Sequence, residues 1–262
     1  MTRPMNKSGL GRACGRMGFA AFAMLAALAV SAAEPQATGV PGRPHVMSWS
    51  ELGKLPDFTT GIWEMRLGPG ALTQRSSPSL TPAYAAMLKA YTAQDTPDAN
   101  CLPPGMPVIM GQPYPMQILF GPREVTLDIE AYMQVRHIYT DGRPLPADPD
   151  PTFNGTSIGH WEGQTLVVDT VGFEPDTPLS ANWGMHHSSK MRIVERFRLT
   201  DPNSLQVVTE VNDPVALTRP WTSTRVFERH RDWTIAEYIC EQNNRNLVDQ
   251  SGKAGIILTP PK

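Results

Sequence analysis

From residue 116 onward, short segments of strand-forming residues alternate with turn-forming pairs at nearly even intervals. The pairs include Gly121-Pro122, Asp141-Gly142 and Glu162-Gly163, all residue types that favour tight turns. Short strands joined by short turns leave no room for crossover helices, so the pattern predicts an antiparallel barrel or sandwich. The number of strands favours a closed or nearly closed up-and-down barrel, because closure removes the exposed edges.

The expected strands are rich in β-branched and aromatic residues. They span 58–67, 117–120, 124–139, 157–161, 165–171, 190–199, 205–212, 221–229 and 234–240. One N-terminal helix is expected over 81–93, because Thr81 suits the N-cap, Pro82 suits the first helical position and an alanine-rich body follows. A single helical turn fits 48–52. The 26 prolines cluster, and they predict a long Pro-rich loop over 95–115.

The first 33 residues have the pattern of a signal peptide. Arg3, Lys7, Arg12 and Arg16 form a positive region, residues 19–30 are apolar, and small residues follow at 31–33. We therefore expect an exported protein, periplasmic or extracellular, with no integral membrane segment after cleavage. The expected organisation is a loose leader at 34–57, one β-barrel domain at 58–250 and a C-terminal tail at 251–262.

The charge and the motifs of the chain limit the classes of ligand and partner that it can bind. The net charge is −2 and both signs are interspersed, so no electrostatic footprint for nucleic acid is present. The chain has no glycine-rich nucleotide loop, no metal-ligand spacing and no nucleophile elbow. We expect a small-molecule ligand or substrate, with no metal and no cofactor; the oligomeric state stays open.

Two of the three cysteines, Cys101 and Cys240, lie beyond the expected cleavage point. In an oxidising compartment an even pair is most simply explained by one disulfide, which would tie the Pro-rich loop to a late strand. Two separate buried thiols are the alternative, because sequence alone does not show whether the side chains meet.

The expected strand at 124–139 has two chemically different faces along 129–139. Odd positions include Met133, Val135 and His137, whereas even positions include Gln134 and Arg136. Successive strand residues point to opposite sides of a sheet. Core composition favours an apolar interior lined by Met133 and His137, so we expect the polar face on the outer surface or under the long loop.

Acidic residues on otherwise apolar strand faces are the main candidates for chemistry. Glu195 shares its face with isoleucine and phenylalanine, and Asp169 and Glu237 also lie among apolar neighbours. A buried unpaired carboxylate is costly, so each acid is expected to be paired, protonated or next to a wet cavity. Salt bridges that close the barrel ends are one interpretation, and a proton-transferring carboxyl in a pocket is the other.

Histidines and aromatic residues complete the candidate pocket. His137 joins Glu195 and Asp169 as a candidate catalytic proton carrier. The candidate ligand-binding residues supply rings, hydrogen-bond donors or charge, and they are Tyr132, Arg136, Tyr139, His160, Trp161, Arg219, Trp221 and Glu237.

Two resemblances add to this interpretation. Gly61-Ile62-Trp63 looks like the Gly-x-Trp motif of the lipocalin barrel, in which the Trp plugs one end. The stretches at 136–144, 159–163, 218–221 and 240–246 together resemble an exported bacterial family of largely unassigned function with a lipocalin-like, calycin-type barrel. The resemblance covers most of 116–246. It implies a fold and an export route, and it transfers no catalytic residues.

Three functions remain open at this point. The first is a cofactor-independent isomerase, dehydratase or other lyase that acts by acid–base chemistry on a small alicyclic or aromatic compound. The second is a non-catalytic carrier of a similar small hydrophobic ligand. The third is an envelope interaction module with a filled barrel. Acids that all pair with arginines favour the carrier, and unpaired acids favour the enzyme.

Overall fold

The computed structural model describes residues 46–68, 77–92, 101–175, 177–180, 182 and 184–240, together with 247–248 and 254–255. The expected signal peptide lies outside the described residues, as do the end of the expected helix at Ala93 and most of the expected tail.

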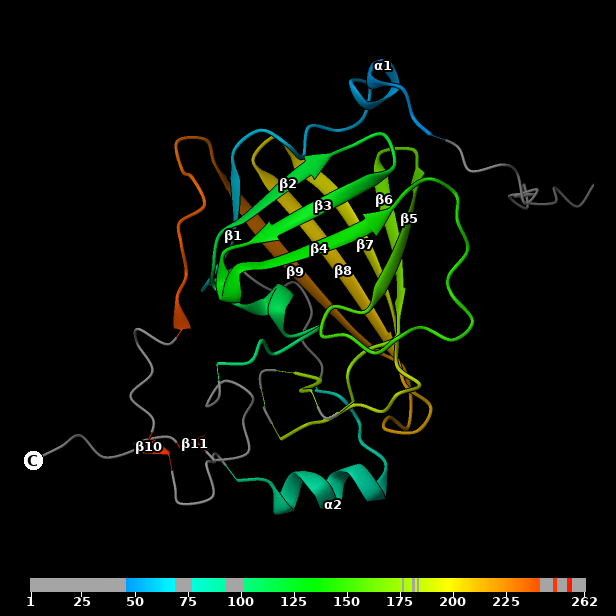
Figure 1. Cartoon of the computed structure of the whole chain (residues 1–262), viewed down its shortest axis with the longest axis vertical. Coiled ribbons are helices and arrows are strands. Elements are labelled where there is room, and N and C mark those ends of the chain that lie inside the picture. Colours follow the sequence, from blue (N-terminus) through cyan, green and yellow to red (C-terminus); the bar gives the residue numbers. More distant parts are fainter. Residues whose placement is uncertain are drawn as a thin grey trace, which may run out of the picture. The chain divides into compact units, whose positions relative to one another are not determined.

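The described residues form a closed barrel of nine strands that follow one another in sequence order (Figure 1). The strands are β1 (Ile62–Met65), β2 (Met116–Phe120), β3 (Glu124–Ile129), β4 (Gln134–Tyr139), β5 (Thr156–Glu162), β6 (Thr165–Val171), β7 (Arg192–Asp201), β8 (Ser204–Asn212) and β9 (Trp221–His230). A separate antiparallel pair joins β10 (Leu247–Val248) to β11 (Ala254–Gly255). The prediction of a mainly β protein built on a closed barrel is confirmed.

One neighbouring pair is parallel in this otherwise antiparallel barrel, which was predicted to be mostly antiparallel. Strands β4 and β5 run in the same direction and pair at Ile138↔Ser157 and Tyr139↔Ile158. A closed ring must contain an even number of direction reversals, so nine strands cannot all be antiparallel. The long connection over 140–155 carries the chain back along the barrel, as a parallel pair requires.

Two helices flank the barrel, at the positions of the expected helical turn over 48–52 and the expected helix over 81–93. The first, α1 (Trp49–Leu52), begins at Ser48 with a capping box formed with Glu51. The second, α2 (Pro82–Ala90), starts with proline at the predicted position. They lie beyond opposite ends of the barrel (Figure 1): Met47 N donates to Pro122 O at the β2–β3 turn, whereas Thr81 N donates to Ala216 O before β9. We call these the α1 end and the α2 end.

Aromatic side chains fill the α1 end. Trp63 is fully buried and its Nε1 donates to Phe58 O at 2.8 Å. The Arg229 guanidinium lies 4.3 Å from the centre of the Trp63 ring and donates to Asp57 Oδ2 at 3.0 Å. The half-buried Trp161 ring packs on Phe58 at a centroid distance of 5.5 Å. Tilted aromatic rings, including Phe58 from the segment before β1, therefore close this end.

The Pro-rich loop closes the α2 end. Every residue from Pro104 to Met110 is buried, and Met106, Ile109 and Met110 belong to the main hydrophobic core. Met106 N donates to Phe153 O at 2.8 Å. Gly111 lies against Arg225 of β9, because a Cβ there would be 3.0 Å from the arginine Nη2. The loop therefore crosses the mouth and helps to fill the interior.

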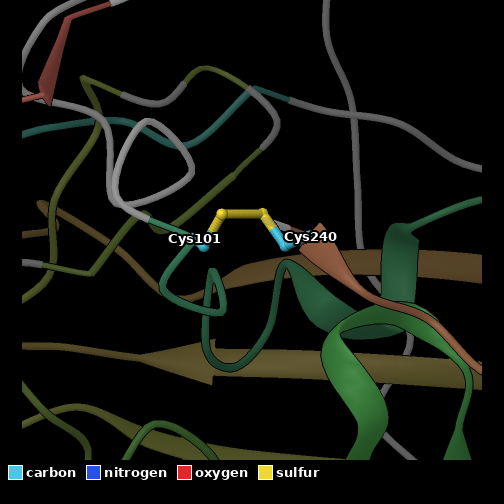
Figure 2. Close-up of a disulfide and its surroundings, with 2 residues drawn as sticks. All are labelled: Cys101 and Cys240. Atoms are coloured by element: carbon cyan, nitrogen blue, oxygen red, sulfur yellow. A yellow bond between two sulfur atoms is a disulfide. The ribbon is translucent and has the colours of Figure 1, made fainter. Parts of the chain in front are cut away.

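Residues 231–240 follow β9 as an extended segment, and the strand expected over 234–240 does not form. We call this segment the C-terminal strap. Its Tyr238 ring packs at 5.4 Å from Tyr114 and 5.2 Å from Tyr132, measured between ring centres. A disulfide between Cys101 and Cys240, with Cα atoms 5.6 Å apart, links the strap to the start of the buried loop (Figure 2). The predicted disulfide is confirmed. In the described part of the chain, no helix is both long and apolar enough to cross a membrane.

Candidate functional site

The inner face of β4 is the polar one, contrary to the sequence-based expectation. Arg136 is 1% exposed inside the barrel, whereas Val135 is 47% exposed and the His137 side chain 50% exposed on the outer surface. The exposed Met133 was also expected inside. Placing Met133 and His137 in the core was therefore wrong.

A tight turn explains this reversal. The predicted strand at 124–139 is two strands, separated by the turn η4 (Ala131–Met133), in which Tyr132 and Met133 have positive φ values of 57° and 50°. Leu127 pairs with Arg136 across the β3–β4 ladder. Paired residues share a face, so the buried odd positions of β3 face the same side as the even positions of β4.

Arg136 forms an ion pair with Glu195 in the barrel interior. Its Nη2 lies 2.5 Å from Glu195 Oε2, and the Glu195 side chain is fully buried. The same Nη2 donates to Thr170 Oγ1 at 3.0 Å, and Nε donates to Ser157 Oγ at 3.3 Å. The predicted burial of Glu195 among apolar residues is confirmed, and its partner is the arginine that was expected outside.

The cluster leaves buried polar atoms without partners. Among the described residues, Arg136 Nη1, Glu195 Oε1 and Thr209 Oγ1 make no hydrogen bond. Glu195 and Thr209 are direct neighbours in the β7–β8 ladder. Each such atom costs about 1–3 kcal/mol if nothing satisfies it, so this cluster has hydrogen-bonding capacity that the described side chains do not use.

A cleft of about 330 Å³ lies in the barrel wall beside this cluster. It is formed by residues 134–137 and 139 of β4 and by residues 152–157, which include the start of β5 and the segment before it. The two parallel strands pair at two positions only, between the end of β4 and the start of β5, and are not paired toward Gln134. Arg136 and Ser157 belong both to the cleft lining and to the interior cluster, so they connect the two.

Ring and amide side chains surround the cleft. His137 Nδ1 lies 3.3 Å from Glu124 Oε1, and both side chains are partly exposed. Asn154 Nδ2 donates to Gln134 Oε1 at 3.1 Å across the gap between the strands. The arrangement offers one histidine, several hydroxyl and amide groups, and the apolar surfaces of Val135 and Phe153.

The turn after β4 holds Tyr139 through a stacked arginine. Arg143 lies 3.8 Å above the Tyr139 ring and donates from Nη2 to Asp141 Oδ2 at 2.7 Å. The hydrogen bonds from the Arg143 side chain lower the pKa of the buried Asp141 below its usual value of 3.8. Asp141 is therefore a charged anchor for Arg143, which stacks on Tyr139 of the cleft lining.

The remaining predicted site residues lie elsewhere. Asp169 is on the outer face of β6, where it forms a bidentate pair with Arg192. Glu237 is exposed on the strap, so its predicted position on an apolar strand face was wrong. Four further predicted residues lie away from the cleft: exposed His160 and Arg219, Trp161 at the α1 end, and buried Trp221 at the α2 end.

Four of the predicted site residues lie together at or beside the cleft, and they are Tyr132, Arg136, His137 and Tyr139. Sequence reasoning missed Gln134 as a binding residue, together with Asn154, Ser157 and Thr170. Asn154 precedes a glycine, and an Asn-Gly pair is typical of a turn rather than of a binding site. Ser157 and Thr170 are paired between β5 and β6. Two hydroxyl groups on otherwise apolar inner strand faces were the sequence signal that could have identified these two residues. Within the described residues, no three His, Cys, Asp or Glu side chains cluster as metal ligands would.

No model of a known protein family matches the chain, and no curated protein is significantly similar to it in sequence.

Proposed function

We propose that this chain is an exported, non-catalytic carrier that binds a small molecule in the β4–β5 cleft. The observation that carries this proposal is the cleft of about 330 Å³, which combines apolar walls with several hydrogen-bonding groups. That volume is near the lower end of the range for ligand pockets. The ligand is accordingly small, about the size of a single substituted ring.

The pairing of the acids favours a carrier over an enzyme. Glu195 is bound by Arg136 and Asp169 is bound by Arg192, while Glu237 is exposed on the strap. The cleft lining itself contains no carboxylate. A carboxyl group that transfers protons to a ligand must lie within hydrogen-bonding reach of it, and none of these three lines the cleft.

The lipocalin-like identity of the barrel is part of this proposal. It is supported by Gly61-Ile62-Trp63, whose Trp is buried at the α1 end beneath Arg229. The nine strands and the parallel pair depart from an eight-stranded up-and-down lipocalin. The disulfide supports export, because such bonds persist in oxidising compartments.

A proton-transfer enzyme is the second candidate, and His137 is the observation that favours it. Its ring lines the cleft, and Glu124 at Nδ1 would orient it as a base. The third candidate, an interaction module, is favoured by the filled barrel interior, but it does not account for the cleft in the wall.

The carrier proposal is tested by titrating the full chain with phenol and with anisole while recording backbone amide NMR shifts. We expect the largest shifts at 134–139 and 152–157. Val135→Trp fills the cleft from an exposed position and should abolish these shifts, whereas Leu119→Trp, an equally exposed site on β2 outside the cleft, should retain them. Shifts that are absent, or that survive in Val135→Trp, contradict binding at this cleft.

A further inference from the structure

Three groups along the cleft form a hydrogen-bonded relay that fixes the orientation of two amides. Tyr132 O is a backbone carbonyl and can only accept a hydrogen bond. It accepts from Gln134 at 3.1 Å, so the Gln134 group that faces it must be the NH₂. The oxygen of Gln134 is then the atom that faces Asn154.

The same logic sets the orientation of Asn154. Because Gln134 presents its oxygen, Asn154 must present its NH₂, and the two atoms lie 3.1 Å apart. The other end of the Asn154 amide is therefore its oxygen. This Oδ1 is buried and has no hydrogen-bond partner among the described residues.

The charges around the cleft are balanced. Two side chains of its lining can carry a positive charge, and each has a carboxylate beside it: Arg136 is paired with Glu195, and His137 lies next to Glu124. A ligand with a net charge would leave water without gaining an unpaired opposite charge. A neutral ligand avoids this cost.

From these observations we infer that the cleft selects a neutral molecule with a hydrogen-bond donor, an alcohol or a phenol, attached to an apolar body. The hydroxyl donates to Asn154 Oδ1, and the apolar body lies against Val135 and Phe153. The inference rests on the proposed carrier function and adds the chemical class of its ligand. A molecule of the same shape without the donor leaves the acceptor unsatisfied and binds more weakly.

Phenol and anisole test the donor requirement, because methylation removes the hydroxyl donor and keeps the ring. With the full, disulfide-bonded chain, NMR titration is expected to show phenol binding about tenfold more tightly than anisole, the penalty for leaving one buried acceptor unsatisfied. Asn154→Leu removes the acceptor and is expected to bring the ratio of the two dissociation constants close to one.

Gln134→Leu gives a second, independent measurement. It leaves Asn154 in place and breaks the relay, so the amide is free to rotate and to offer its NH₂ to the ether oxygen of anisole. The preference for phenol over anisole is expected to decrease, because anisole then binds more tightly relative to phenol. Gln206→Leu, the same exchange on the outer face of β8, serves as the matched control and should keep the wild-type ratio.

Three contrary results have different meanings. If both probes shift the cleft amides with equal affinity in the wild-type chain, the donor inference is overturned and the carrier function stands. If neither probe shifts them, the carrier function at this cleft is overturned and the donor inference falls with it. A phenol preference that persists in Asn154→Leu also overturns the inference, because the preference would then come from another acceptor.

Discussion

Arg136 of β4 and Glu195 of β7 lie 59 residues apart in the sequence and form a fully buried ion pair inside the barrel. Removing one member of such a pair leaves a buried charge without its counter-ion. We expect Glu195→Met or Arg136→Met alone to lower the free energy of unfolding by about 3–5 kcal/mol.

The double replacement Arg136→Met/Glu195→Met is expected to cost much less than the sum of the single changes, because two apolar side chains remove both charges together. Urea unfolding of the four proteins at neutral pH measures the coupling. Additive losses would show that the pair does not interact strongly in solution.

The turn after β4 should make stability depend on acid pH. Hydrogen bonds from Arg143 lower the pKa of Asp141 in the folded chain, so folding favours the ionised form. This contribution is present above the usual pKa of 3.8 and is lost as the pH falls below that value toward the lower folded pKa.

Arg143→Gln should therefore raise the pKa of Asp141, observed by NMR titration of its carboxyl group, and Asp141→Asn should flatten the loss of stability below about pH 4. An unchanged Asp141 titration in Arg143→Gln would contradict the assigned cause.

Gly159 allows β4 and β5 to approach at their short parallel pairing. A Cβ at this position would lie 2.8 Å from Ile138 Cγ2 and 3.3 Å from Leu166 Cδ1. We expect Gly159→Ala to destabilise the barrel by about 1–3 kcal/mol through overpacking. Gly121→Ala is the control, because its nearest contact is an ordinary 3.5 Å. Thermal unfolding compares them, and equal melting temperatures would refute the packing argument.

Most strands could be predicted from the sequence, although 234–240 forms none. The inward face of β4 could not be predicted, and Arg136 shows why. Alternation and turn pairs locate β6 correctly, because they depend on neighbouring residues alone. The direction of Arg136 depends on the turn at Tyr132 and Met133, whose positive φ values are unusual for such residues. A prediction that lacks this turn continues the alternation of inward and outward positions from β3 into β4. It therefore assigns every side chain of β4 to the wrong face of the sheet.

The cleft could not be predicted for a related reason. It exists because β4 and β5 are parallel and briefly paired, and that pairing follows from ring closure rather than from any local motif. The burial of Glu195 was predicted correctly, since Ile193 and Phe197, which lie two positions away on the same strand face, are apolar. Which arginine would pair with it could not be singled out, because the ion pair joins strands whose inward-facing positions depend on the whole barrel.

The disulfide is expected to contribute strongly to stability. It closes a segment with a sequence separation of 139 residues. In the chain-entropy model, a loop of this length stabilises the folded chain by about 4–5 kcal/mol. Replacing both Cys101 and Cys240 with alanine should lower the free energy of unfolding by an amount of this order, measured by urea unfolding. A loss below about 1 kcal/mol would show that the unfolded chain is already restricted without the bond.

Reduction of the disulfide should also weaken binding in the cleft, although neither cysteine lines it. The bond anchors the strap, whose Tyr238 packs on Tyr132. The carbonyl of Tyr132 orients Gln134, which in turn orients Asn154. Releasing the strap removes the packing that supports the first member of this relay.

We expect the affinity for phenol to fall by a few-fold on reduction, within the range of about 0.5–2 kcal/mol that packed networks transmit between sites. Tyr238→Leu, with the disulfide intact, should reproduce the loss because it removes the same packing contact. Trp233→Leu changes the strap where it stacks on His230 and should leave the affinity unchanged. If reduction frees the strap in NMR spectra while phenol binds as before, the relay is held by the turn itself and not by the strap.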